Sequence, residues 1–82
     1  MELEAPRAET SAHYITMGID EDLDEAARQA LRRMIDLIAG RTNLSKTQAY
    51  QLCSLAADLR VTQIVNGTKG IHVMLEKRLI EG

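Results

Sequence analysis

One amphipathic segment, residues 22 to 39, constrains the fold of this chain more than any other part of the sequence. At 100° per residue, its apolar side chains fall on one half of a helical wheel and its charged side chains on the other. We therefore predict a helix here, capped by Asp20 or Asp22 and ended by Gly40. The apolar half, which must pack on another element, comprises Leu23, Ala26, Ala27, Ala30, Leu31, Met34, Ile35, Leu37 and Ile38.

The segment that begins at Ser45 predicts a second helix. Ser45 and Gln48 have the spacing of a capping box, in which each side chain bonds a backbone N–H that the helix leaves unpaired. Leu44, just before the cap, can pack onto Ala49. Because more than half of this helix is apolar, we expect it to lie between two layers. The expected buried stripe consists of Ala49, Leu52, Leu55, Ala56 and Leu59, widened by Tyr50, Cys53 and Ala57.

Two segments have the composition and alternation of strands. Residues 13 to 17 are rich in β-branched and aromatic side chains, and Gly18 is expected to close this strand. Residues 71 to 75 alternate apolar and polar side chains, as half-buried strands do. A shorter β-rich piece, 61 to 65, precedes the turn dipeptide Asn66-Gly67.

These elements predict an α+β fold in the order strand, helix, helix, strand. We expect the outer strands, 13 to 17 and 71 to 75, to pair as a small antiparallel sheet with the two helices on one face. Residues 1 to 12 are polar and hold the only proline, so they are interpreted as an extended arm or a linker end. Residues 13 to 82 then form a single domain whose other sheet face needs cover.

The core available to this domain is thin. The chain has 82 residues, of which 45% are apolar, but its only aromatic side chains are Tyr14 and Tyr50. Small chains with modest cores usually need an additional source of stability, such as a disulfide, a metal or a partner. The single cysteine, Cys53, excludes an internal disulfide. We therefore expect stabilisation by a partner surface.

Charge argues against two classes of partner. The formal net charge is -2, which attracts neither nucleic acid in general nor an anionic membrane. No apolar run approaches the ~20 residues of a membrane span, and the acidic start does not resemble a signal peptide. We expect a cytoplasmic protein, in which a lone thiol stays reduced.

Few residues have the types and spacing that a catalytic site or a metal site needs. His13 and His72 lie on predicted strands and could be neighbours across the sheet, but no third metal ligand is recognisable, so a structural or surface role is favoured. Cys53 lies mid-helix on an apolar flank, which favours packing over nucleophilic catalysis. Asp58 is interpreted as a solvated or interdomain-facing carboxylate. We name no catalytic residue and no metal ligand.

A helix-turn-helix is one alternative. Residues 55 to 65 have an apolar first helix, a short turn near Arg60, and Thr62-Gln63 at the start of a second helix. Against this hypothesis, Asn66-Gly67 and Gly70 would interrupt the recognition helix, each glycine costing about 1 kcal/mol relative to alanine. DNA binding through this motif requires residues 62 to 78 to be helical.

The sequence HYITMGIDEDLDEAARQALRRMIDLI, which begins at His13, is followed by LSKTQAYQLCSLAADLRVTQIVNGTKGIHVML, which ends at Leu75. Together they resemble the C-terminal portion of the acetamidase/formamidase family of amidohydrolases. Members of that family are several times longer and place a large β-rich portion before this segment. The resemblance covers about three quarters of the chain.

The resemblance implies hydrolysis of small linear amides, such as formamide or acetamide, to a carboxylate and ammonia. A divalent metal such as zinc is implicated in some members, but none is expected in this segment. The family's catalytic groups are expected mainly in the absent portion, so the chain alone is expected to be inactive. Asp58, Gln63 and Asn66 are polar positions in the matching stretch that could line an interdomain cleft.

The expected partner is the missing N-terminal β-rich portion or a second copy of the chain. A hypothesis from another class is therefore a self-associating scaffold or regulatory module that buries the open sheet face against its own copy.

Overall fold

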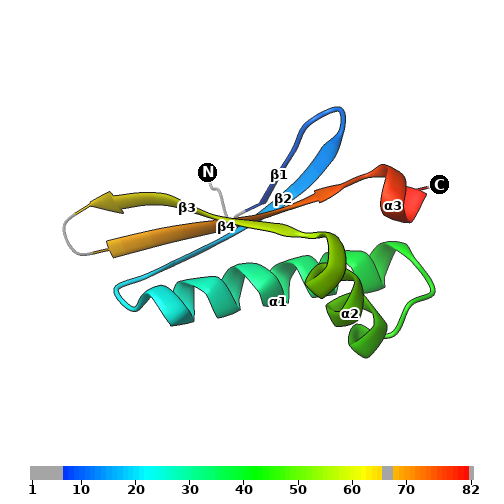
Figure 1. The fold of residues 1–82 in the computed structure, drawn as a ribbon, viewed down its shortest axis with the longest axis horizontal. Helices are drawn as coiled ribbons and strands as arrows, with labels where there is room; N and C mark the ends of the chain where they lie inside the picture. Colours follow the sequence, from blue (N-terminus) through cyan, green and yellow to red (C-terminus); the bar gives the residue numbers. More distant parts are fainter. Residues whose placement is uncertain (1–6, 66–67, 82) are drawn as a thin grey trace.

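The computed structural model describes residues 7–65 and 68–81, with side chains for residues 8–61 and 68–80. Within these ranges the chain forms a four-stranded antiparallel sheet and three helices (Figure 1). The fold is α+β, as the sequence predicts. In chain order the elements are β1 Arg7–Glu9, β2 His13–Asp20, α1 Leu23–Arg41, α2 Lys46–Ala56, β3 Asp58–Val65, β4 Thr68–Glu76 and α3 Arg78–Glu81.

The two predicted outer strands pair with each other, and two further strands flank them. β2 and β4 are antiparallel, with Tyr14 opposite Leu75 and Thr16 opposite Val73. The strand order is β1-β2-β4-β3, so the predicted pair occupies the centre of the sheet. The sheet is wider than expected because β1 forms within the predicted arm and β3 begins before the β-rich piece at 61.

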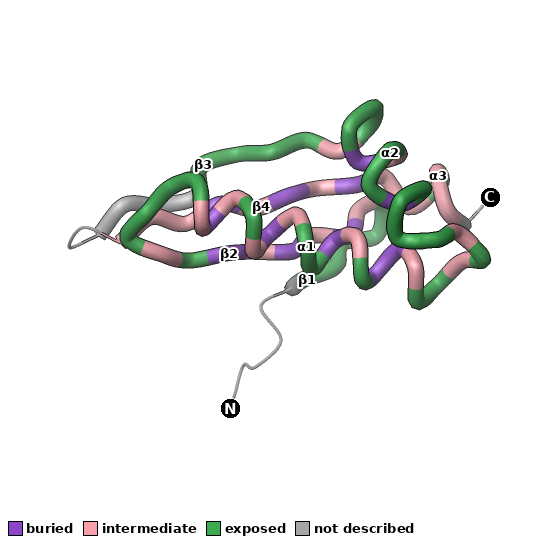
Figure 2. The backbone as a smooth tube through the Cα atoms, turned by 90° about the horizontal axis from the view of Figure 1, so that it is seen from below, coloured by how far each residue is buried: buried purple, intermediate pink, exposed green. Residues whose placement is uncertain are grey.

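Both long helices lie on one side of the sheet, below it in Figure 1. α1 packs across β2 and β4, and its buried residues face the alternate strand residues Tyr14, Thr16, Ile71, Val73 and Leu75. Seen from below in Figure 2, the buried residues run along α1 and the two central strands. The buried residues of α1 are Ala26, Ala30, Met34, Leu37 and Ile38, all on the predicted apolar half.

The aromatic ring in this core, that of Tyr14, has two cations, Arg41 and Lys77, over it. Tyr14 is 1% exposed, and Arg41 Nη1 donates a hydrogen bond of 3.1 Å to its hydroxyl. Lys77 Nζ lies 5.1 Å from the ring centroid and forms an ion pair of 2.7 Å with Glu9. These contacts join the end of α1, the start of β2 and the end of β4.

The expectation that Gly18 closes the first strand is wrong. β2 continues to Asp20, and Gly18 is buried where α1 crosses it. A Cβ at this position would lie 2.0 Å from the backbone oxygen of Ala26 and 2.8 Å from the amide nitrogen of Ala30. The glycine therefore permits close approach of helix and strand rather than a turn.

α1 begins where predicted but ends later. The side chain of Asp22 accepts a 2.9 Å hydrogen bond from the backbone N–H of Asp24. Gly40, expected to end the helix, lies inside it. The helix ends at Arg41, and the hydroxyl of the next residue, Thr42, donates to the carbonyl of Ile38 at 2.7 Å.

α2 confirms the predicted capping box and the first part of the predicted buried stripe, but not the residues that follow Cys53. The Ser45 hydroxyl accepts from the N–H of Gln48 at 3.1 Å, and the Gln48 side chain accepts from the N–H of Ser45 at 2.9 Å. The buried residues are Ala49 and Cys53, whereas Leu55 is 88% exposed. The second layer expected over this helix is not formed by the described residues.

The segment weighed as a helix-turn-helix does not form one. α2 ends at Ala56, and the chain enters β3 at Asp58. β4 then runs from Thr68 to Glu76. Within the range 62 to 78, where a recognition helix was required, residues 62–65 and 68–76 are therefore strand, and only Arg78, the first residue of α3, is helical.

Candidate functional site on the uncovered sheet face

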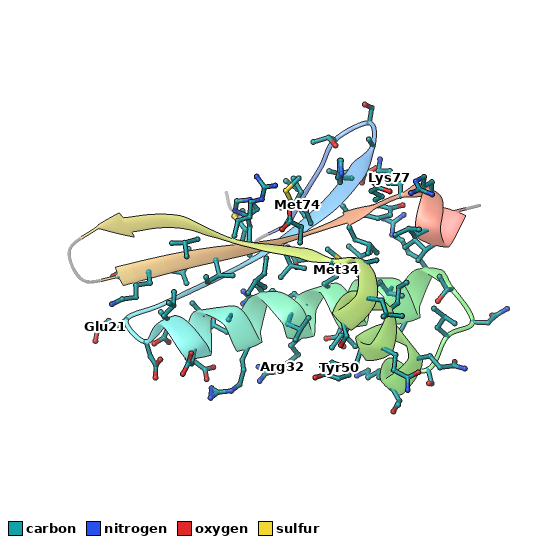
Figure 3. The ribbon with its side chains drawn as sticks, viewed as in Figure 1. Glu21, Arg32, Met34, Tyr50, Met74 and Lys77 are labelled. Carbon is teal, nitrogen blue, oxygen red and sulfur yellow. The ribbon has the colours of Figure 1, made fainter. Side chains whose placement is uncertain are left out.

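The face of the sheet opposite the helices carries the site candidates. Cross-strand partners in antiparallel sheets share a face, and the register places Ile15 beside Met74 and Met17 beside His72. In Figure 3, Met74 lies on the side of the sheet away from α1, whereas Met34 lies between the sheet and α1. None of the described elements covers this face, which we call the uncovered face.

A cavity of about 500 Å³ lies at the end of the uncovered face where β4 leads into α3. Its walls hold two ion pairs, Arg60 with Asp58 and Arg78 with Glu76, each with an N–O distance of 2.7 Å. The lining residues are His13, Ala56, Asp58, Arg60, Met74, Glu76, Arg78 and Leu79.

Both ion pairs in the cavity wall are largely exposed. The side chains of Asp58 and Arg60 are 53% and 62% exposed, so solvent screens their attraction, and such pairs contribute about 0–1 kcal/mol each. They can exchange partners at low cost. A carboxylate or a guanidinium group from another polypeptide could replace either partner.

Of the three predicted cleft residues, Asp58, Gln63 and Asn66, only Asp58 has a side chain that the structure describes. Asp58 lines the cavity, on the uncovered face. Gln63 lies on β3 opposite Gly70, beyond an irregularity in the register, and its side chain lies outside the described part. Asn66 lies outside the described residues as well.

Sequence reasoning missed His13 and Glu76 as neighbours in this cavity. They are cross-strand partners because the first residue of β2 pairs with the last residue of β4. The predicted antiparallel pairing of these strands contained that signal, since the start of one strand must meet the end of the other.

The two histidines are not cross-strand neighbours. His13 pairs with Glu76 and His72 pairs with Met17, so four residues, about 13 Å at 3.3 Å per residue, separate their positions along the sheet. Among the residues that the structure describes, no group of three His, Cys, Asp or Glu side chains converges to hold a metal ion. The described residues therefore do not fit a metal site.

Cys53 is a packed residue of α2. It is 5% exposed and lies in the apolar cluster with Ala49 and Met34. Burial raises the pKa of its thiol, because a low-dielectric environment disfavours the thiolate. The environment agrees with the predicted packing role.

In the described part of the chain, no helix has both the length and the apolar character that a bilayer crossing requires.

Comparison with known proteins found no matching family model and no matching curated protein. Solved structures do match. An acetamidase from Bacillus halodurans is 41% identical over 93% of this chain, with a TM-score of 0.84. The chain resembles the acetamidase/formamidase family.

Two further structures agree with this resemblance. A predicted acetamidase/formamidase from Thermoanaerobacter tengcongensis is 25% identical over 92% of this chain, with a TM-score of 0.81. An acetamidase from Yersinia enterocolitica is 26% identical over 90% of this chain, with a TM-score of 0.84. The chain spans only 26%, 25% and 22% of the lengths of the three proteins, respectively.

Proposed function

We propose that this chain is the C-terminal segment of an acetamidase/formamidase-like amidohydrolase, which converts small linear amides to a carboxylate and ammonia. The observation that carries the proposal is the 41% identity with the Bacillus halodurans acetamidase over 93% of this chain. A likeness in fold alone would say nothing of chemistry, but this one extends to sequence.

The chain supplies one part of that enzyme and is inactive alone. Amide hydrolysis needs an activated water or nucleophile and donors that stabilise the developing oxyanion. We assign these groups, and any divalent metal such as zinc, to the preceding β-rich portion that the family resemblance implies. We also place the protein in the cytoplasm, where the single thiol stays reduced.

The uncovered face is the surface proposed to meet that β-rich portion. It presents apolar side chains, Ile15, Met17 and Met74, between charged ones. An apolar centre with a polar rim is the usual anatomy of a protein interface. The cavity at its end, with Asp58 in its wall, would then become an interdomain cleft. Gln63 and Asn66 are proposed to lie along the same boundary.

A chimera tests this function. The segment of the Bacillus halodurans acetamidase that matches this chain is replaced by the chain itself, and ammonia release from formamide and acetamide is measured. We expect the chimera to hydrolyse at least one of the two amides. The matched control is the same acetamidase with the segment deleted, which should be inactive. A folded chimera without turnover of either amide would contradict the proposal.

The 82-residue chain is assayed in parallel, with and without Zn²⁺. We expect no turnover above the buffer rate under either condition. Metal-dependent ammonia release by the pure chain would overturn the assignment of the catalytic groups to another portion.

A further inference from the structure

We propose that the free edge of β3, from Asp58 to Val61, is where a strand from the remainder of the longer enzyme joins this sheet. The inference rests on the proposed function and adds to it the place and the manner of attachment. The joining strand carries apolar side chains on the helix-facing side of the sheet. On the uncovered face it carries charges opposite in sign to those of Asp58 and Arg60.

β3 has the backbone geometry to accept a strand. It is an edge strand, hydrogen-bonded to β4 on one side only within the described part of the chain. The N–H and C=O groups of alternate residues in an edge strand point away from its partner, where they can bond a further strand. The register with β4 is regular from Asp58 to Val61 and shifts between Val61 and Gln63, which limits the regular edge to these residues. The opposite edge, β1, is only three residues long.

The apolar side chains of this edge lack cover. Leu59 and Val61 stand opposite the buried residues Val73 and Ile71 of β4, so they lie on the helix-facing side of the sheet. They are nevertheless 51% and 54% exposed, because α1 packs across β2 and β4 and leaves β3 to one side (Figure 2). A strand placed beside β3 with apolar side chains on this side would bury both residues.

A second copy of this chain fits the edge poorly. In an antiparallel self-pair centred on Leu59, only residues 58 to 60 of the two strands overlap. Centring the pair on Arg60 instead places two arginines opposite each other, which is unfavourable. A strand of different sequence has neither limit, and it can place a base opposite Asp58 and an acid opposite Arg60. The Asp58–Arg60 ion pair can be exchanged for such contacts, because both side chains are more than half exposed.

The lengths of the matched proteins point to the source of that strand. This chain spans 26%, 25% and 22% of them, so about three quarters of such an enzyme must attach to it. The family resemblance places that remainder before this segment, next to β1. From β1 to β3 is three strand spacings, roughly 14 Å, and α1 occupies the helix-facing side between them. A remainder that reaches β3 therefore crosses the uncovered face, the surface already proposed to meet it.

Amide hydrogen exchange tests the strand pairing directly. In the isolated chain, we expect the N–H groups of residues 58 to 61 that point away from β4 to exchange rapidly, because no described group bonds them. In the acetamidase chimera, the same groups should exchange at least about tenfold more slowly, because the joining strand bonds them. Mass spectrometry of fragments that cover residues 58 to 61 measures the rates. The interior amides of α1 are the control and should exchange slowly in both proteins, since they are bonded within the helix.

A matched pair of lysine substitutions gives a second readout. Val61→Lys places a charge where the joining strand would bury it, whereas Gln51→Lys places one at an exposed position of α2. In the chimera, Val61→Lys should lower the melting temperature by at least about 2 °C more than Gln51→Lys does. In the isolated chain, both substitutions should leave the urea midpoint nearly unchanged, because both positions are exposed there.

Ammonia release by the same chimera separates this inference from the proposed function. Turnover combined with β3 amides that exchange as fast as in the isolated chain would overturn the strand pairing alone. Slow exchange without turnover would support the pairing and contradict the proposed function. Slow exchange that is already present in the isolated chain and is lost on dilution would make a second copy the occupant and overturn the inference. Equal melting temperatures for the two lysine variants of the chimera would overturn it too, and a chimera that does not fold would contradict both proposals.

Discussion

At the scale of single residues, the contact between Gly18 and α1 determines how closely the main helix approaches the sheet. The two buried alanines of α1, Ala26 and Ala30, meet β2 at this glycine. Two residues before Gly18 on β2, the Thr16 hydroxyl donates a buried 2.7 Å hydrogen bond to the carbonyl of Ala30. Small side chains and this bond together bring helix and strand backbones closer than ordinary side-chain packing allows.

Gly18→Ala should therefore destabilise the chain. The added Cβ would lie 2.0 Å from a backbone oxygen, so the helix must move and lose packing, at a cost of about 1–3 kcal/mol or more. Urea denaturation followed by circular dichroism measures the free energy of unfolding. An unchanged midpoint would show that α1 can shift without penalty and would refute this account of the glycine.

At the scale of elements, local signals predicted the starts of the helices better than their ends. The side chains of Asp22 and Ser45 cap helices at the expected places because a cap involves residues within one turn of each other. Gly40 was misread because a glycine stops a helix only when the backbone turns there, which the residue alone does not determine. The exposure of Leu55 could not be predicted either, since it depends on which layers are present around α2.

Gly40→Ala should stabilise the chain, in contrast to the same substitution at Gly18. Gly40 is exposed within α1, and nothing lies within 4 Å of where its Cβ would be. Replacing a helical glycine by alanine reduces the entropy that the backbone loses on folding, a gain of about 0.5–1 kcal/mol. The two variants are compared in one urea series at one protein concentration. A lower midpoint for Gly40→Ala would mean that the helix end needs glycine after all.

At the scale of the whole molecule, the sequence predicted the fold class and the central strand pair, but not the full sheet or the cavity. The alternation of residues 71 to 75 identifies a half-buried strand directly. The start of the edge strand β3 also alternates, with Asp58 and Arg60 beside Leu59 and Val61, but Leu59 equally continues the apolar stripe of the preceding helix, so the sequence did not locate the start of this strand. The cavity is lined by cross-strand neighbours such as His13 and Glu76, which the predicted antiparallel pairing implies only when β4 is taken one residue beyond the predicted strand.

Two methionines on opposite sides of the sheet test which face the isolated chain uses for its own stability. Met34 is fully buried between the sheet and α1, so Met34→Ala should lower the free energy of unfolding by about 2–5 kcal/mol. Met74 lies on the uncovered face, so Met74→Ala should lower the free energy of unfolding of the isolated chain by less than about 1 kcal/mol. Urea denaturation of the isolated chain measures both values.

The same pair also tests where the rest of an amidohydrolase would dock. In the acetamidase chimera, Met74→Ala should lower the melting temperature by more than it does in the isolated chain, because the uncovered face is then buried against the β-rich portion and the substitution leaves a cavity. Met34→Ala should lower the melting temperature by a similar amount in the chimera and in the isolated chain, since the residues around Met34 belong to this chain alone. If Met74→Ala were as mild in the chimera as in the isolated chain, the β-rich portion would have to dock elsewhere, and the uncovered face would lose its assigned role.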